Sequence, residues 1–274
     1  AAGGKLFHSV FGLDYRVALT IGAIVILLYT FMGGFLAVCV TDFIQGNLML
    51  IGLLVVPLAA WGIVETGNVA NLLESSGAVG GAAGFLSLVN DGTGTYSAVD
   101  IISQLAWGLG YCGMPHILVR FMAVRDEKEL KKSKGIAIGW VALSLLFAVI
   151  IGVIGRAYLY PELLTDGAEE NVFIHMIIKL FTQDVKAPII GGIFLCGILA
   201  AIMSTADSQL LVSASSMAED IFKGVVKKDA DDKTVLRISR ITVLVIAVLA
   251  YIIALNPNSS IMGLVSNAWA GLGA

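Results

Sequence analysis

Oxygen-bearing residues recur on one side of a long apolar stretch, 187–217. On a helix with 3.6 residues per turn, four positions of this stretch fall within one arc of about 100°: Ala201, Ser204, Thr205 and Ser208. Hydroxyl and carbonyl oxygens are neutral ligands for a hard cation such as Na⁺. Serine and threonine in apolar helices also bond back to their own backbone or hold helices together. The stripe therefore indicates either a weak, reversible cation site or helix packing.

Two acidic residues accompany these apolar stretches. Asp207 lies about 60° from Ser204 around the predicted helix. A carboxylate near the centre of a bilayer costs ~2.5–3.5 kcal/mol, so Asp207 is a candidate to bind an ion, carry a proton or orient the hydroxyls. Asp42 is predicted at a turn between two apolar stretches. A carboxylate there is usually solvated or caps a helix, and the alternative is a role in ion exit.

The apolar stretch 98–119 carries residues that loosen a helix, all within eight positions: Gly108, Gly110, Gly113 and Pro115. Inside a membrane, such backbone is tolerated where its freed carbonyls meet protein, water or a ligand. Trp107 and Tyr111 are four residues apart and share one helix face. The pattern indicates an aromatic wall beside a substrate cavity, or equally a packing seam of small residues with two core aromatics.

The composition is that of an integral membrane protein. Hydrophobic residues make up 58% of the 274 positions and charged residues 14%, against roughly 25% charged residues in soluble domains. The net charge of −3 gives no indication of nucleic-acid binding. Three scattered cysteines indicate neither a disulfide framework nor a metal site. We expect contact with membrane lipids, no nucleic-acid partner and no cofactor besides a coupling ion.

Apolar runs long enough to cross ~30 Å of hydrocarbon predict an all-α polytopic protein. The predicted spans are 17–40, 43–64, 98–119, 135–158, 187–217 and 236–255, with an incomplete one at 261–274. Six Lys and Arg residues lie in 120–134 and six in 223–240, out of 17 in the chain. The positive-inside rule therefore predicts that loops 120–134 and 220–235 are cytoplasmic and that loops 65–97 and 159–186 are extracytoplasmic. We expect one membrane domain, 1–274, truncated at both ends.

Four strings resemble the sodium/solute symporter family, and most closely its bacterial proline-transporting members. They are GGFLAVxxTD at 33–42, WGLGYxGxPHILxRFMA at 107–123, ILAAIMSTADSQLLVSASSMAEDIFK at 198–223 and MGLVSNAWAGLGA at the end. The resemblance implies a bacterial plasma-membrane location and a leucine-transporter-type fold with two inverted repeats. It also implies that this chain covers core helices four to nine and the start of the tenth. The first core helix, which supplies half of the family's sodium site, would lie outside it.

The resemblance also implies roles for individual residues. Ala201, Ser204 and Thr205 match the family's sodium ligands, and Trp107, Tyr111 and Pro115 match positions implicated in proline binding. Asp42 matches an acidic position implicated in ion-dependent transport. Asp207 is not a general sodium ligand of the family, so Asp207 and Ser208 remain candidates for an ion path or for supporting the ligands.

The predicted function is sodium-coupled import of L-proline by alternating access, without covalent chemistry. One alternative is a symporter for pantothenate, a sugar or another amino acid. A second is a symporter-like membrane sensor domain. A third is an intramembrane hydrolase that uses Asp207 and Asp42 as a catalytic pair, which their different predicted depths disfavour.

Overall fold

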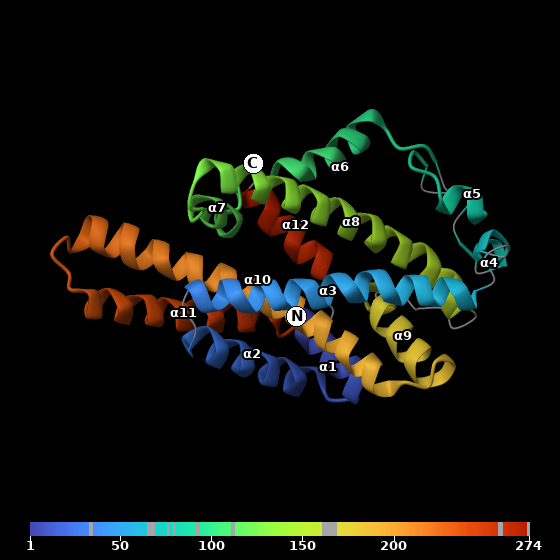
Figure 1. Cartoon of the computed structure of the whole chain (residues 1–274), viewed down its shortest axis with the longest axis horizontal. Helices are drawn as coiled ribbons and strands as arrows, with labels where there is room; N and C mark the ends of the chain where they lie inside the picture. Colours follow the sequence, from blue (N-terminus) through green and yellow to red (C-terminus); the bar gives the residue numbers. More distant parts are fainter. Residues whose placement is uncertain are drawn as a thin grey trace. The chain divides into compact units, whose positions relative to one another are not determined.

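The computed structural model describes residues 1–32, 35–64, 69–75, 77–78, 80–90, 94–110, 113–160, 169–256 and 260–272. Within these ranges the chain is helical apart from turns and one isolated bridge between Asn90 and Thr95 (Figure 1). The prediction of an all-α protein is confirmed. Four of the described helical stretches are long and apolar enough to cross a membrane: Val38–Ile63, Glu127–Leu159, Pro188–Val226 and Asp232–Ala254.

The described helices vary from a single turn to 33 residues. The α-helices are α1 (Ala2–Phe11), α2 (Tyr15–Met32), α3 (Phe35–Ile63), α4 (Val69–Ser75), α5 (Gly81–Phe85), α6 (Ala98–Gly110), α7 (Pro115–Met122), α8 (Glu127–Leu159), α9 (Val172–Lys179), α10 (Pro188–Ser215), α11 (Asp232–Ala254) and α12 (Ile261–Leu272). Shorter helical segments of other types are the 3₁₀ turn η2 (Glu169–Asn171) and the π-helical segments η3 (Leu180–Asp184) and η4 (Ser216–Val226).

The boundary between the first two membrane helices differs from the sequence prediction. The predicted spans 17–40 and 43–64 meet at a turn that contains Asp42, whereas α2 ends at Met32 and α3 begins at Phe35. Asp42 therefore lies inside α3, and its predicted place at a turn is wrong. The polar groups there need no turn, because Thr41 donates to the Val38 carbonyl (3.0 Å) and Asp42 pairs with an arginine described below.

The predicted span 98–119 is interrupted, as its glycines and proline indicate. Helix α6 ends at Gly110, α7 begins at Pro115, and Met114 belongs to neither helix. The connection 65–97 includes α4 and α5. Leu73 of α4 is fully buried, and the Glu74 carboxylate accepts the Ala82 N–H (3.1 Å), which satisfies a free donor in the first turn of α5.

Large apolar side chains lie on the outside of the long helices. Exposed fractions of 72%, 60% and 67% at Ile136, Leu145 and Val149 of α8 are typical of a surface that faces lipid. With 33 residues, α8 is about 50 Å long, which exceeds the ~30 Å hydrocarbon core. Its first turn has a capping residue, since the Asp126 carboxylate accepts the Glu129 N–H (2.9 Å). The chain is thus a multi-pass membrane protein.

The chain divides into two compact units. The first comprises Ala1–Leu48, Pro115–Met122 and Gly197–Leu264. In it, the Tyr15 hydroxyl donates to the Ala254 carbonyl (2.7 Å) and the Thr20 and Tyr251 hydroxyls bond at 2.8 Å, which joins α2 to α11. Helix α10 approaches α3 closely at Gly197, where an added Cβ would contact the Leu48 side chain at 3.5 Å.

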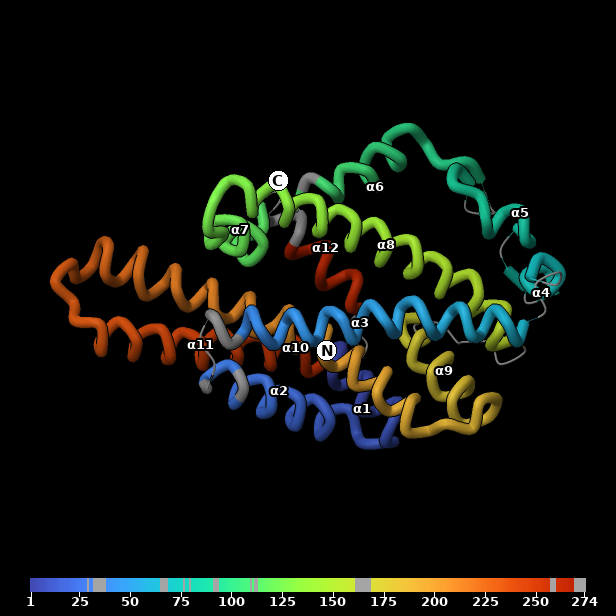
Figure 2. Tube along the Cα trace, in the orientation of Figure 1, coloured from blue at the N-terminus to red at the C-terminus, as the bar shows by residue number. Residues whose placement is uncertain are grey.

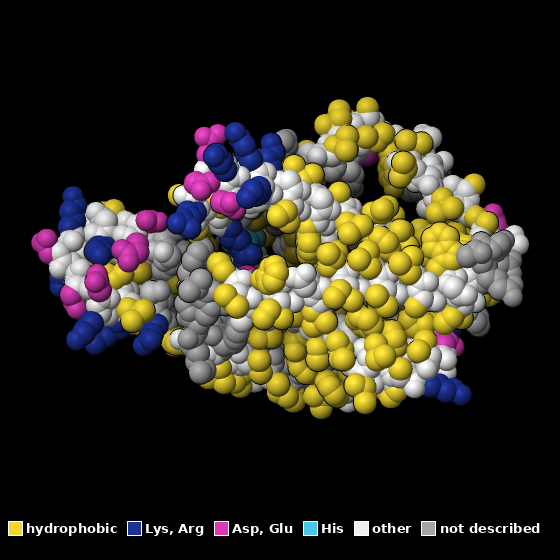
Figure 3. Space-filling model, viewed as in Figure 1, with side chains coloured by type: hydrophobic (Ala, Val, Ile, Leu, Met, Phe, Trp, Pro, Cys, Tyr) yellow, Lys and Arg dark blue, Asp and Glu magenta, His cyan; other side chains and the backbone are white. Residues whose placement is uncertain are grey.

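The C-terminal part of the first unit is a helical hairpin of η4 and α11. Figure 2 follows its path through the connecting turn. Ala218, Ala230 and Val235 form its small buried core. Figure 3 shows Lys, Arg, Asp and Glu side chains gathered over its tip. At the start of α11, the Thr234 hydroxyl donates to Asp231 Oδ1 (2.5 Å), and this hydrogen bond lowers the pKa of the Asp231 carboxyl.

The second unit comprises Met49–Met114, Ala123–Cys196 and Val265–Ala274. In it, α9 packs against the end of α8, and Lys179 donates to the Tyr158 carbonyl (3.1 Å) and lies over the Tyr158 ring. The Tyr158 hydroxyl in turn donates to Asp184. Within the predicted loop 159–186, α9 continues directly into η3.

The contact between α8 and α9 depends on a glycine. A Cβ at Gly155 would lie 2.5 Å from Val172 Cγ1 and 2.8 Å from Met176 Sδ, whereas a Cβ at Gly152 would have no atom within 4 Å. We therefore expect Gly155→Ala to lower the free energy of unfolding by about 1–3 kcal/mol through overpacking. Gly152→Ala, on the same helix, is the control and should be neutral or stabilising. Thermal unfolding in detergent measures both, and equal stability of the two variants would contradict this packing.

Candidate functional site

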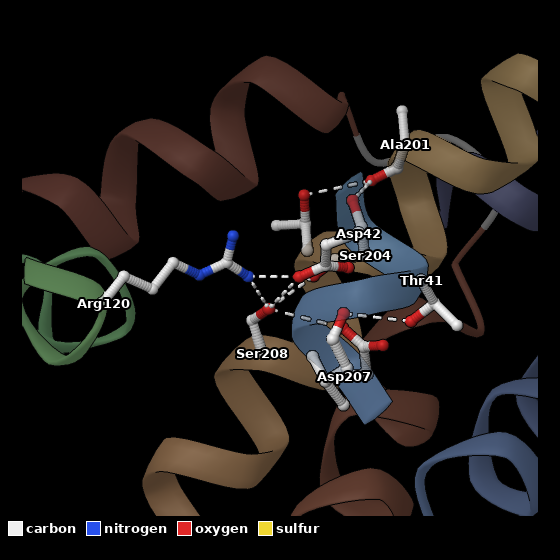
Figure 4. Close-up of polar contacts among 9 residues, drawn as sticks. Thr41, Asp42, Arg120, Ala201, Ser204, Asp207 and Ser208 are labelled. Carbon is white, nitrogen blue, oxygen red and sulfur yellow. Dashed lines mark hydrogen bonds and ion pairs between the residues drawn. The ribbon is translucent and has the colours of Figure 1, made fainter. Parts of the chain in front are cut away.

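Residues from three helices form a polar cluster inside the first unit. Asp42 comes from α3, Arg120 from α7, and Asp207 and Ser208 from α10 (Figure 4). Arg120 Nη2 donates both to Asp42 Oδ2 and to Ser208 Oγ, the latter at 2.5 Å. One guanidinium nitrogen therefore joins α7 to α3 and α10.

The Ser208 hydroxyl is the centre of this cluster. Its oxygen lies 2.7 Å from the Ser204 carbonyl, 3.3 Å from Asp42 Oδ2 and 3.4 Å from Asp207 Oδ1. A hydroxyl has one hydrogen, so Ser208 donates to one of these acceptors at a time. The shortest of the three distances favours the Ser204 carbonyl, one helical turn earlier. In that case neither Asp42 nor Asp207 receives a hydrogen bond from the Ser208 hydroxyl.

Both carboxylates of the cluster are buried and incompletely paired. Asp207 has no exposed surface and the Asp42 side chain is 8% exposed, whereas the Arg120 side chain is 44% exposed. Asp42 Oδ1 and Asp207 Oδ2 have no hydrogen-bond partner among the residues that the structure describes. Two carboxylates and one guanidinium leave a formal charge of −1 when both acids are ionised. A buried group in this condition attracts a cation or a proton.

The predicted sodium ligands lie immediately before this cluster on α10. The Ser204 and Thr205 hydroxyls both donate to the Ala201 carbonyl, at 3.1 and 3.0 Å. Each hydroxyl oxygen keeps its lone pairs free when its hydrogen is used in this way. The three residues therefore gather three neutral oxygens in one place, as the stripe in the sequence indicates, and Thr205 is exposed there. This arrangement is compatible with a cation ligand set.

The residues predicted to bind substrate belong to different parts of the chain. Trp107, on α6 of the second unit, is half-buried. Pro115 is exposed and is the first residue of α7, in the first unit. Tyr111 lies outside the described residues. The aromatic wall beside a substrate cavity stays a prediction.

Arg120 is the residue that the sequence analysis missed. It was grouped with the basic loop 120–134 and given no role. The available signal is the position of Arg120, which follows the apolar run 117–119 and precedes Phe121 and Met122 rather than standing among other charges. An arginine in such a run needs an anionic partner, and Asp42 lacked one in the sequence prediction.

A cavity of about 400 Å³ also opens within the first unit, between α1, α2, α10 and α11. Its lining is mainly aliphatic and includes Leu19, Ile202 and Ala250, with Gln209 and Ser213 as polar members. Ser204, Thr205 and the Arg120 cluster do not line it. The cavity suits apolar groups rather than an ion.

The chain belongs to the sodium:solute symporter family, whose model matches residues 1–274. Together with the apolar helices, this membership defines a multi-pass bacterial plasma-membrane protein and confirms the resemblance seen in the sequence.

Its curated relatives include two named proline transporters. The chain is 44% identical over 272 residues to the osmoregulated proline transporter OpuE of Bacillus subtilis, covering 99% of this chain and 53% of that protein. It is 43% identical over 282 residues to a sodium/proline symporter of Staphylococcus aureus, covering 100% of this chain and 51% of that protein. The chain thus spans about half the length of the curated relatives it matches.

Proposed function

We propose that the protein containing this chain is a secondary transporter that couples inward sodium movement to the uptake of L-proline. The observation that carries the proposal is the group of three neutral oxygens at Ala201, Ser204 and Thr205 in a chain of the sodium:solute symporter family. The names of its relatives in Bacillus subtilis and Staphylococcus aureus support proline as the solute. The reaction is transport without covalent chemistry.

The proposed sodium site has no formal charge, which suits reversible binding. Na⁺ would bind the Ala201 carbonyl and the two hydroxyls, and the hydroxyl hydrogens that now point to that carbonyl would turn away from it. One turn further along α10, Ser208 supplies an additional oxygen, which lies 3.3 Å from Asp42 Oδ2 of α3. We place the ion path along this sequence of oxygens, from the neutral ligands towards the buried carboxylates.

The proposed proline site uses aromatic side chains. Proline combines an apolar ring with a zwitterionic head group, and Trp107 and Tyr111 can pack against the ring. An aromatic face also attracts the ammonium group, by ~0.5–2 kcal/mol. Sodium binding would favour the outward-open arrangement and raise its affinity for proline, and by linkage proline would raise the affinity for sodium.

Uptake of labelled L-proline into proteoliposomes containing the full-length protein tests the function. We expect an inward sodium gradient to drive accumulation above the equilibrium level, and an equal potassium gradient to give only equilibration. Counterflow of labelled L-proline against unlabelled pantothenate, sugars or other amino acids distinguishes proline from the alternative solutes. Accumulation that is independent of sodium, or counterflow driven by another solute but not by proline, would refute the proposal.

The sodium ligands are tested by single substitutions. Ser204→Ala and Thr205→Ala each remove one neutral oxygen, so we expect roughly a 10-fold rise in the sodium concentration for half-maximal uptake, equivalent to ~1.4 kcal/mol. Ser213→Ala, at an exposed serine farther along α10, is the matched control and should leave that concentration unchanged. The ion site is misplaced if neither ligand variant differs from the control.

The role of Trp107 is tested by comparing the effect of its substitution on proline binding with the effect on sodium binding. Trp107→Ala removes a ring that packs against proline but supplies no sodium ligand. We expect the dissociation constant for proline to rise by about 5-fold or more, in keeping with the loss of an aromatic contact of ~1 kcal/mol or more. The dissociation constant for sodium, measured in the absence of proline, should change by less than about 2-fold. A larger effect on sodium than on proline would remove Trp107 from the substrate site.

A further inference from the structure

The Arg120 cluster contains two buried carboxylates for a single guanidinium. We propose that Arg120 is an exchangeable counter-ion, which pairs with Asp42 and moves to Asp207 when the transported cation reaches Asp42. This inference rests on the proposed function, because it assigns Asp42 and Ser208 to the ion path. It gives Asp207 a defined role as the second partner of Arg120.

The geometry of the cluster brings Arg120 close to both acids. Arg120 Nη2 bonds directly to Asp42, and Ser208 Oγ, which it contacts at 2.5 Å, lies 3.4 Å from Asp207 Oδ1. The guanidinium is thus separated from Asp207 by one hydroxyl (Figure 4). A guanidinium has five N–H donors, of which the bonds at Nη2 use only part. Rotation of the half-exposed Arg120 side chain past Ser208 would bring its remaining donors to Asp207.

The burial of the acids explains why an exchange is favoured over simple displacement. A cation that binds Asp42 competes with the guanidinium for the same carboxylate, and a displaced buried charge without a partner is costly. Asp207 is fully buried and Oδ2 has no partner among the described residues, so it lacks the compensation that Arg120 can supply. When the cation pairs with Asp42 and Arg120 pairs with Asp207, the formal charges of the cluster balance.

The exchange would also link ion binding to the interrupted helix. Arg120 lies on α7, which begins at Pro115, one of the residues predicted to bind substrate. Ser208 and Asp207 lie on α10 together with the predicted sodium ligands. A change of partner by Arg120 therefore changes how α7 is held against α10. Arg120 and Asp207 act as positioning residues, not as ligands of sodium.

The test is a double-mutant cycle between Asp207→Asn and Arg120→Gln in the full-length protein. Sodium affinity is read from the rise in unfolding temperature with sodium chloride, against choline chloride at equal ionic strength, which requires no transport. In the presence of Arg120, Asp207→Asn removes the second partner, and we expect it to raise the sodium dissociation constant by about 5-fold or more. In the Arg120→Gln background there is no guanidinium to move, so we expect a change of less than about 2-fold.

The controls separate the exchange from other roles of Asp207. Asp220→Asn, at an exposed acid on η4, should not change sodium affinity in either background. Arg120→Lys retains a positive charge at position 120. It should therefore restore part of the effect of Asp207→Asn on the sodium dissociation constant. An equal effect of Asp207→Asn in both backgrounds, or no effect in the first, overturns the exchange. Absence of sodium-driven proline uptake by the unsubstituted protein would instead overturn the proposed function.

Discussion

A carboxylate enclosed by apolar helices is stable only if a donor or a cation compensates its charge. In this protein that requirement joins three helices, because Asp42 of α3 and Ser208 of α10 share one nitrogen of Arg120 from α7. These bonds connect segments that are far apart in the sequence. Aliphatic packing alone is non-directional and would not fix the position of one segment along another. The arrangement of the site therefore depends on this polar contact.

The interrupted helix makes this contact available. A continuous helix through 98–119 would fix the direction of its last turns, whereas the chain ends α6 at Gly110 and begins α7 at Pro115. A proline at the first helical position lacks only an N–H that no helical carbonyl would have accepted. The short α7 then carries Arg120 in its last turn. The same glycines and proline that predicted a loosened backbone thus also position the arginine.

Much of the helical architecture could be predicted from the sequence, since long apolar runs leave few alternatives to membrane helices. The hydroxyl stripe was also visible, because Ala201, Ser204 and Thr205 are neighbours on one helix. Two features were not predictable. Asp42 was assigned to a turn because its partner Arg120 lies 78 residues away, and short-range patterns do not detect such a pair. The sequence groups Arg120 with a charged loop because Arg125 and four lysines follow it within 14 residues.

Along α10, the neutral oxygens of Ala201, Ser204 and Thr205 are followed by the carboxylate of Asp207. The group at Ala201, Ser204 and Thr205 has no formal charge, so it would bind a sodium ion weakly enough to release it. The carboxylate of Asp42 would attract the ion more strongly, and without a competing cation it would retain the ion. Arg120 limits this attraction, because its guanidinium already occupies Asp42 and the entering ion has to replace it. The Arg120 guanidinium therefore leaves the proposed path attractive to sodium and prevents the tight retention that Asp42 without an arginine would cause.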